Sequence, residues 1–378
     1  MKRHNLPGRH QMAKRPNRKV VTIQDVAQEA DVSQTTVSLV LQDKGNLRPE
    51  TRARVRKAIK KIGYHPRTKR TSSTDSATAH FALIVDDITN PYFHNLYKGI
   101  DNNLPAEGVV LTMASSEDSI ARQGELLCNL AGCGTNGLIL VPATGTKPED
   151  IEDQKVGDPA LILAVRNIER GSFNYIGFNP MQGMMIATEH LTSLGHRDIA
   201  FIGGFQANFA YGERYAGFAA SLVKHGVVPH PDRVIDGGST RAFGREAVER
   251  VLQNGKPPDA IIGYNDFVAL GIIDGLLAAG MTPGKDIAVV GYDNIPEAAE
   301  QPVPLTTVSA PTDRLAEIIA KTLLSMKLQD AGENAINVTC PCSLVVRESC
   351  GVSVQGATAA GSEASLPQNQ PPAAGRRR

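Results

Sequence analysis

Residues 21–66 contain three short runs in which apolar residues recur at i, i+3, i+4 and i+7, the spacing of one helix face. The runs are Ile23, Val26, Ala27 and Ala30; then Val37, Val40 and Leu41; then Val55, Ala58, Ile59 and Ile62. Thr22 is expected to cap the first helix, with Asp25 as the capping-box acid, and Ser33 to cap the second. Pro49 suits the first turn of the third helix and Gly63 its C-cap. The first two helices are joined almost without a loop, which predicts a helix-turn-helix, although an ordinary small helical bundle would show the same apolar pattern.

Beyond residue 78 the pattern changes to short, continuous apolar runs separated by segments of helix length. One series is "FALIVDD", "GVVLTMA", "GLILV" and "ALILAV", and a second is "YIGF", "DIAFIGG", "DAIIGY" and "IAVVGYD". Continuous apolar strands are typical of buried parallel sheets. The sequence therefore predicts an α/β core of two doubly wound parallel-sheet subdomains behind a three-helix headpiece. In such sheets ligands bind outside the carboxyl ends of the strands, here residues 86–93, 265–266 and 293–294.

Positive charge is concentrated at the N-terminal end of the chain. Residues 1–20 contain seven Lys or Arg and no acid, and residues 21–70 contain eleven Lys or Arg against five acids. The first 70 residues thus carry a net charge of +13, whereas the whole chain of 378 residues carries +1. A basic region around a helix-turn-helix predicts binding to double-stranded DNA, which is a polyanion.

The remaining composition predicts a cytoplasmic protein without a membrane partner. The hydrophobic content of 41% is typical of a soluble globular protein, no apolar run could cross a bilayer, and no apolar segment follows the basic N-terminus as a secretory signal would require. The five cysteines lack zinc-site spacing, so reduced thiols are expected. The expected domains are a basic extension (1–20), the helix-turn-helix domain (21–66), a hinge or linker (67–78), the core (79–350) and a disordered tail (351–378).

The sequence lacks the common enzymatic motifs G-x-x-x-x-G-K-[ST], H-E-x-x-H and G-x-S-x-G. No catalytic residue, metal ligand or cofactor is therefore predicted, and the protein is not expected to be an enzyme.

The motifs and their order resemble the lactose/galactose repressor (LacI/GalR) family of bacterial transcription regulators, from about Val21 to Cys350. "VTIQDVAQEADVSQTTVSLVL" and "RPETRARVRKAIKKIGYHP" resemble the DNA-binding domain of that family, and "DDITNPYFHNLYKGI", "PDAIIGYNDFVALG" and "IAVVGYDNIPEA" resemble its effector-binding core. The resemblance implies a periplasmic-binding-protein-like core and a homodimeric repressor on near-palindromic operator DNA. It also implies a small-molecule effector (a sugar, a sugar derivative or another metabolite) between the two subdomains.

The resemblance further implies that the chain passes between the subdomains three times, near 166–174, 308–312 and 334–340. One subdomain would then comprise about 79–166 with 312–334, and the other about 174–308 with 340–350.

On the second predicted helix, three polar residues lie off the apolar stripe and are expected to face the major groove: Gln34, Thr35 and Ser38. Leu39 stands where the family often has Arg, which indicates an apolar base contact and an unusual operator. Thr22 and Thr36 are expected to contact phosphates. A solvated helix face is the alternative for each polar residue.

Two departures from the family concern the turn and the hinge. Asp31 stands where the family usually has Gly, and Asp tolerates positive φ better than most residues. In the hinge, Arg67, Arg70 and Ser73 replace the usual Asn, Ala and Leu, so the apolar minor-groove wedge is missing. Arg67, Lys69 and Arg70 are instead expected to hold DNA by charge.

The effector is expected to contact residues that follow the core strands and helices: Asn90, Tyr92, Phe93, Arg166, Arg214, Asn265 and Asp293. Core packing is the alternative for the two aromatic residues, and a loop cap or an interdomain pairing for the aspartate. Val165 and Phe178 stand where many members of the family have Asp, which removes two acceptors. The resulting hypothesis is a less hydroxylated or anionic ligand, with the two arginines as anion partners.

A periplasmic-type sugar-binding transport protein is the alternative function, because such proteins share the core fold. It would need a secretory signal and no basic helix-turn-helix, whereas this sequence shows the reverse.

Overall fold

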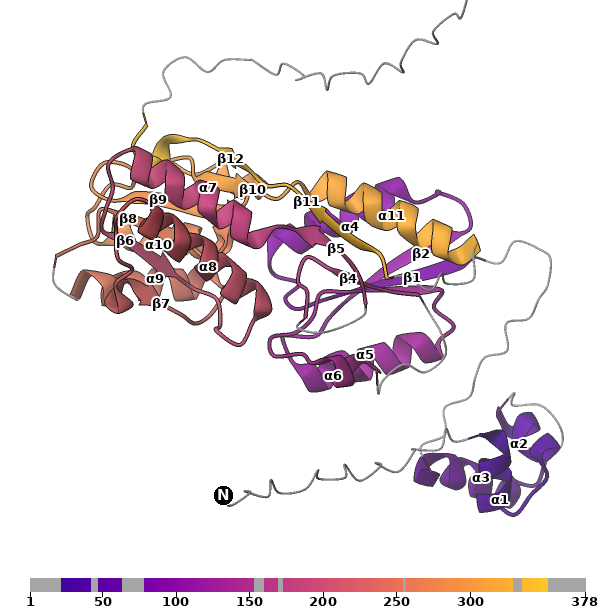
Figure 1. Ribbon diagram of the computed structural model, residues 1–378. Helices are drawn as coiled ribbons and strands as arrows, with labels where there is room; N and C mark the ends of the chain where they lie inside the picture. Colours follow the sequence, from indigo (N-terminus) through magenta and orange to yellow (C-terminus); the bar gives the residue numbers. More distant parts are fainter. Residues whose placement is uncertain are drawn as a thin grey trace, which may run out of the picture.

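Figure 1 shows the computed structural model, which describes residues 22–41, 47–62, 78–152, 160–168, 173–253, 256–328 and 335–352. Several expectations fall outside these ranges. They concern the basic extension 1–20, the C-cap at Gly63, the hinge residues Arg67, Lys69, Arg70 and Ser73, and the tail from 353 onward.

The headpiece consists of α1 (Ile23–Glu29), α2 (Gln34–Leu41) and α3 (Pro49–Ile62). Its core is made by the predicted apolar stripes, with Val26, Val37 and Val55 fully buried. Both predicted N-caps are confirmed. Thr22 and Asp25 form a capping box in which the Asp25 carboxylate accepts from the Thr22 backbone N–H at 2.7 Å, and Ser33 Oγ accepts from the backbone N–H of Thr36 at 3.1 Å.

The turn between α1 and α2 depends on a left-handed residue. Asp31 has φ = 49°, which confirms the expectation that this position requires positive φ and that Asp can supply it. Two basic residues of α3 hold this region: Arg54 Nη2 donates to the Asp31 carbonyl at 3.3 Å, and Lys61 pairs with Glu29 at 2.6 Å. The third helix thus fixes the angle at which α2 leaves the turn.

The first subdomain is built on a six-stranded parallel sheet, sheet A. Its strands, in spatial order, are β11 (Asn337–Cys340), β5 (Asn174–Phe178), β4 (Ala160–Ala164), β3 (Gly137–Leu140), β1 (Ala79–Val85) and β2 (Val109–Ser115). Its helices are α4 (Pro91–Asn103), α5 (Ile120–Gly132), α6 (Pro148–Glu152) and α11 (Thr312–Leu328). α4 and α11 pack together on one face of sheet A although they are far apart in sequence, and α5 and α6 lie on the other (Figure 1).

The second subdomain is built on sheet B. Its strands, in spatial order, are β12 (Ser343–Val345), β10 (Thr306–Ser309), β9 (Ala288–Asp293), β8 (Ala260–Gly263), β6 (Ile199–Ile202) and β7 (Val234–Ile235). β12 runs antiparallel to β10 and the other pairs are parallel. Its helices are α7 (Pro180–Ser193), α8 (Phe209–Lys224), α9 (Arg241–Gln253) and α10 (Asp266–Ala278), and they pack as the pairs α7 with α8 and α9 with α10. The predicted fold class is confirmed.

Two of the expected subdomain boundaries need correction. β5 pairs in parallel with β4 and β11, so 174–178 belongs to sheet A and the first crossing follows Phe178 rather than lying at 166–174. β11 also belongs to sheet A, so the last crossing falls between Cys340 and Ser343 rather than at 334–340. An apolar run identifies a strand, but the sheet that the strand joins depends on pairing with residues distant in sequence. The middle crossing runs from β10, which ends at Ser309, to α11, which packs on α4.

Candidate functional site

α2 presents a polar surface opposite its buried stripe. Gln34 and Thr35 are exposed, while Val37 and Val40 are buried in the headpiece core. The other predicted contact residues of α2 are partly exposed: Thr36, Ser38 and Leu39. A helix with this distribution can enter a major groove without losing its packing against α1 and α3.

The two threonines predicted to contact phosphates have local partners. The Thr22 hydroxyl lies 2.6 Å from the Asp25 carboxylate, and the Thr36 hydroxyl lies 2.9 Å from Ser33 Oγ. Their first role is to shape the helix starts, so a phosphate would have to share these groups with the caps.

In the core, Arg166 follows β4 and pairs with two acids that follow neighbouring strands, Asp86 after β1 and Asp118 after β2. Its Nη2 lies 2.6 Å from Asp86 Oδ2, and its Nη1 lies 3.5 Å from Asp118 Oδ1. Val165, immediately before it, has φ = 66°, a strained value for a β-branched residue. Burial alone would lower the pKa of Arg166, but Asp86 and the nearby Tyr264 raise it, so the guanidinium stays charged.

Arg214 on α8 is the corresponding buried cation of the second subdomain. It donates to the Tyr264 carbonyl oxygen and lies 3.6 Å from Asp293 Oδ1. Its guanidinium carbon lies 3.8 Å from the centre of the Tyr292 ring and 4.4 Å from that of Tyr264. The two rings and the carboxylate hold the guanidinium through cation–π and charge contacts.

The two arginine clusters face each other between the subdomains. Burial raises the pKa of Tyr92 on α4, and the Asp293 carboxylate of the second subdomain raises it further. Three buried polar atoms of this region have no hydrogen-bond partner among the described residues: Asp86 Oδ1, Tyr92 Oη and Arg214 Nε. Unpaired buried polar atoms are costly and rare, so these three make this region a candidate binding site.

The other predicted effector residues cap helices or pack in the core. Asn90 caps α4 by accepting from the Tyr92 backbone N–H at 3.0 Å, and Asn265 caps α10 by accepting from Val268 at 2.8 Å. Phe93 is 3% exposed and packs edge-on against Tyr92. The structure therefore brings Tyr92, Arg166, Arg214 and Asp293 together and leaves the remaining three at the border of this group.

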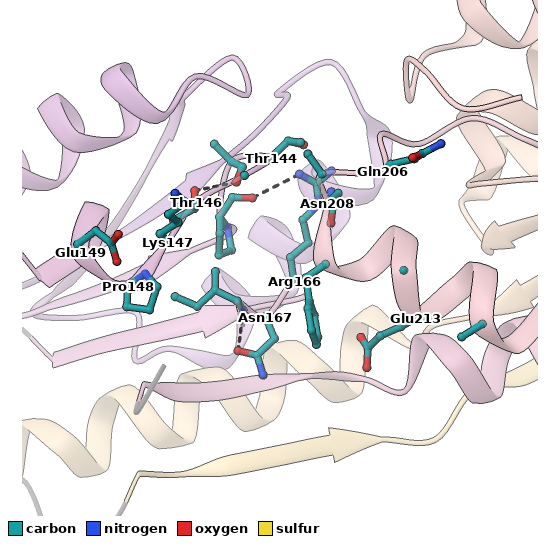
Figure 2. Close-up of a pocket in the computed structure, with 18 of the residues that line it drawn as sticks. Thr144, Thr146, Lys147, Pro148, Glu149, Arg166, Asn167, Gln206, Asn208 and Glu213 are labelled. Carbon is teal, nitrogen blue, oxygen red and sulfur yellow. Dashed lines mark hydrogen bonds between the residues drawn. The ribbon is translucent and has the colours of Figure 1, made fainter. Parts of the chain in front are cut away.

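A cavity of about 840 Å³ opens beside Arg166, with walls from both subdomains. Figure 2 shows Thr144, Thr146 and Lys147 on the first subdomain, Gln206, Asn208 and Glu213 on the second, and Arg166 between them. Of the seven predicted effector residues, all of them described, Arg166 lines the cavity and the other six do not. Sequence reasoning missed the remaining walls, although loop 142–149 follows the carboxyl end of β3 and the start of α8 follows that of β6, which are positions where ligands bind in such sheets. It also missed Asp86 as a specific partner, although the residue lies in the "DD" that ends the first core strand.

Two buried acids in the second subdomain have raised pKa values. Burial raises the pKa of Asp293 to about 8, although the charge of Arg214 lowers it. Burial also raises the pKa of Asp266 to about 6, although the hydrogen bond from Thr307 lowers it. The charged form of Asp293 is thus disfavoured in the folded core near neutral pH.

The pH dependence of stability should report this burial. Aspartate in an unfolded chain titrates near pH 3.9, so folding takes up protons between about pH 4 and 8 and the unfolding free energy contributed by Asp293 falls as pH rises. We expect Asp293→Asn to gain stability relative to the unmodified protein between pH 5 and 8, measured by urea denaturation. A difference between the two proteins that stays constant over this range would contradict the prediction.

A helix-turn-helix headpiece joined to a two-lobed core with a polar interdomain site defines a ligand-controlled DNA-binding protein. Residues 22–67 match the bacterial regulatory proteins of the lacI family, and residues 188–350 match the periplasmic binding protein-like domain. The HTH-type transcriptional repressor PurR of Pectobacterium atrosepticum is 30% identical over 318 residues, which cover 82% of this chain and 93% of the relative. The chain belongs to the LacI family: it is a DNA-binding transcriptional repressor with an effector-binding core, and it is not an enzyme.

Solved structures agree with this assignment. The complex of the transcriptional regulator CelR with cellobiose matches with a TM-score of 0.64 and 27% identity, covering 87% of this chain and 99% of that one. The Lac repressor dimer bound to operator and the anti-inducer ONPF matches with a TM-score of 0.64 over 88% of this chain and 99% of that one, and at 24% identity it shows the shared fold. Within the described residues, no helix is both long and apolar enough to cross a membrane.

Proposed function

We propose that this repressor acts in the cytoplasm as a homodimer, and that its effector is a neutral, hydroxyl-rich molecule bound between the two subdomains. The observation that carries the effector class is the pairing of both cleft arginines with acids, Arg166 with Asp86 and Arg214 with Asp293. An anionic ligand would have to take Arg166 from the Asp86 carboxylate and leave that carboxylate buried without a counterion. We therefore propose a neutral effector in place of the anionic ligand that the sequence favoured.

A neutral polyol satisfies the groups that remain. Asp86 Oδ1 can accept from a hydroxyl, Arg214 Nε can donate to one, and Tyr92 Oη can do either. These groups compensate for the acceptors lost at Val165 and Phe178. The solved relative CelR holds cellobiose, which is a neutral sugar.

The cleft is connected to the crossings between the subdomains. The Tyr292 ring packs on Arg214, and its hydroxyl shares a 3.3 Å hydrogen bond with Cys342 Sγ in the last crossing. Cys342 Sγ lies in turn 3.6 Å from the carbonyl oxygen of Asn179, in the first crossing. An effector that moves Arg214 thereby acts on two crossings at once. The change in subdomain angle alters the spacing of the two headpieces, and operator affinity changes by the difference in effector affinity of the two states.

On DNA, we propose that the exposed side of α2 reads bases through Gln34, Thr35, Ser38 and Leu39. Thr22 and Thr36 would support phosphate contacts, and the charged hinge residues Arg67, Lys69 and Arg70 would track the backbone. A two-fold dimer requires an operator with inverted half-sites, as the operator-bound dimer of the shared fold suggests.

Selection of a DNA site from a random pool, followed by fluorescence anisotropy with neutral sugars and with anionic metabolites, tests the proposal. We expect two mirror-related half-sites, a sedimenting dimer and a shift in operator affinity by neutral sugars. A shift produced by anionic metabolites alone would refute the effector class, and a monomer on an asymmetric half-site would refute the assembly.

A further inference from the structure

Asp266 is a fully buried acid at the start of α10, packed against β9. Burial raises its pKa to about 6, so the carboxyl is mostly ionised at neutral pH and can only accept hydrogen bonds. A Cβ on Gly291 of β9 would collide with Asp266 Oδ1. The absence of a side chain at position 291 therefore leaves the space that the Asp266 carboxylate occupies.

The Asp266 carboxylate holds the chain where it leaves β9. Its Oδ2 accepts from the Ile295 backbone N–H at 2.9 Å, and its Oδ1 accepts from the Thr307 hydroxyl at 2.5 Å. Thr307 Oγ1 accepts in turn from the backbone N–H of Asn294 at 3.4 Å. The two backbone N–H groups that follow Asp293 are thus bound to one carboxylate, one of them directly and the other through a hydroxyl.

The segment held in this way has an unfavourable backbone. Asp293 has φ = 119° and Asn294 has φ = 55°, values that side chains other than glycine rarely adopt. Such conformations persist only where the surrounding contacts impose them. In this conformation the Asp293 carboxylate lies 3.6 Å from Arg214 Nη2, and its side chain is 10% exposed.

We propose that Asp266 is a positioning residue of the cleft: through Ile295 and Thr307 it holds Asp293 in the conformation that brings the Asp293 carboxylate to Arg214. The functional meaning of this role rests on the effector site proposed above, because Asp266 is fully buried and cannot touch an effector itself. Without these hydrogen bonds, the backbone at Asp293 would relax toward an ordinary φ and its carboxylate would leave its buried place beside Arg214.

The pH dependence of stability reports where the Asp293 carboxyl lies, and it needs no effector. Burial holds the pKa of Asp293 at about 8 in the folded protein, whereas an unfolded aspartate titrates near pH 3.9. The gain in folding equilibrium constant from Asp293→Asn should therefore increase roughly five- to tenfold between pH 6.5 and 7.5. A carboxyl that has left its buried place titrates near its ordinary pKa, and the gain then hardly changes with pH.

Several groups face Asp293 and could also affect its titration. The charged ones are Arg214 on α8, Asp266 on α10, and Arg166 and Asp86 of the first subdomain. Burial raises the pKa of the three other titratable neighbours, so they stay neutral in this pH range: Tyr92, Tyr292 and Cys342. A variant that keeps all these groups is needed, and Thr307→Val is such a variant.

Thr307→Val removes the hydroxyl that links Asn294 to Asp266 and keeps the size of the side chain. In this background, urea denaturation of the full chain should show that the gain from Asp293→Asn changes less than about twofold between pH 6.5 and 7.5. A change this small means that the pKa of Asp293 has fallen below about 6.5. Asp266→Asn replaces one acceptor oxygen by a donor and should give the same result, so it serves as the second variant if Thr307→Val does not fold.

Thr307→Ser and Thr188→Val are the controls. Thr307→Ser keeps the hydroxyl and should restore the five- to tenfold change. Thr188 is also fully buried, but its hydroxyl donates to the Met184 carbonyl oxygen within α7 at 2.8 Å, so Thr188→Val should leave the change intact. A cooperative urea transition shows that each variant is folded.

A five- to tenfold change that persists in both Thr307→Val and Asp266→Asn would overturn the positioning role of Asp266. The same loss of pH dependence in Thr188→Val would overturn it as well, because any lost buried hydrogen bond would then have this effect. No effector is present in these measurements, so such a failure leaves the proposed function standing. Neutral sugars that never shift operator affinity would instead overturn the proposed effector class, whatever the urea measurements show.

Discussion

Replacing Arg214 by methionine is expected to abolish the effector response and to destabilise the core. The guanidinium is buried and is held by the Tyr264 carbonyl, the Asp293 carboxylate and the faces of two tyrosines. Where Asp293 is ionised, removal of Arg214 leaves that carboxylate buried without a counterion, which costs roughly 3 kcal/mol or more. Effector affinity should fall by at least about 30-fold, the lower end of what truncating a buried charged contact costs.

The loss of stability should grow with pH. Arg214 holds the pKa of Asp293 down against the effect of burial, so its removal raises that pKa further and makes ionisation of Asp293 more costly. Urea denaturation at pH 6 and pH 8 should show the larger difference between variant and unmodified protein at pH 8.

Two further variants separate the role of the Arg214 side chain from the effect of losing a positive charge. Arg214→Lys keeps the charge but loses the planar fork that donates and stacks, so we expect it to recover little of the effector affinity. Arg314→Met is the control, because Arg314 pairs with Glu317 on the exposed surface of α11 and should matter little. Full effector binding by Arg214→Met would show that Arg214 is a packing residue only.

Replacing Gln34 by alanine is expected to weaken operator binding about 5- to 150-fold, the range given by a loss of about 1–3 kcal/mol for one good base contact. Gln34 is exposed at the first position of α2, beside a buried stripe that fixes the orientation of the helix. Because phosphate contacts supply most of the sequence-independent affinity, binding to random DNA should change little. Anisotropy titrations at one salt concentration, with operator DNA and with random DNA, measure the ratio of the two affinities for each variant.

Gln24→Ala provides the comparison for Gln34. Gln24 is the same residue type and is also exposed, but it lies on α1, which is not expected to enter the groove. If Gln34→Ala loses affinity equally for operator and random DNA, Gln34 contacts the phosphate backbone rather than bases. A loss in Gln24→Ala equal to that in Gln34→Ala would refute the assignment of α2 as the reading helix.

The sequence by itself determined the headpiece and the fold class. The stripes of α1, α2 and α3 and the capping pair Thr22 and Asp25 follow from interactions within a few residues of chain, and the positive φ of Asp31 was expected from the glycine that the family usually has at this position. Such interactions leave a local pattern that can be read directly. The strands of the core were visible for the same reason, because each is a continuous apolar run buried on both faces.

Only the tertiary structure decided which sheet each strand joins and what the site contains. β5 and β11 pair in the same sheet although more than 150 residues separate them in sequence. Because of this pairing, two subdomain boundaries differ from those predicted from the sequence. Arg166 was predicted as an anion partner, but Asp86 and Asp118, in the segments that follow β1 and β2, pair with it. The cavity beside Arg166 is formed by loop 142–149 and the start of α8, two segments without any shared sequence pattern. Contacts between distant segments depend on strand pairing and on packing between subdomains, and a local pattern of polar and apolar residues does not encode either of them.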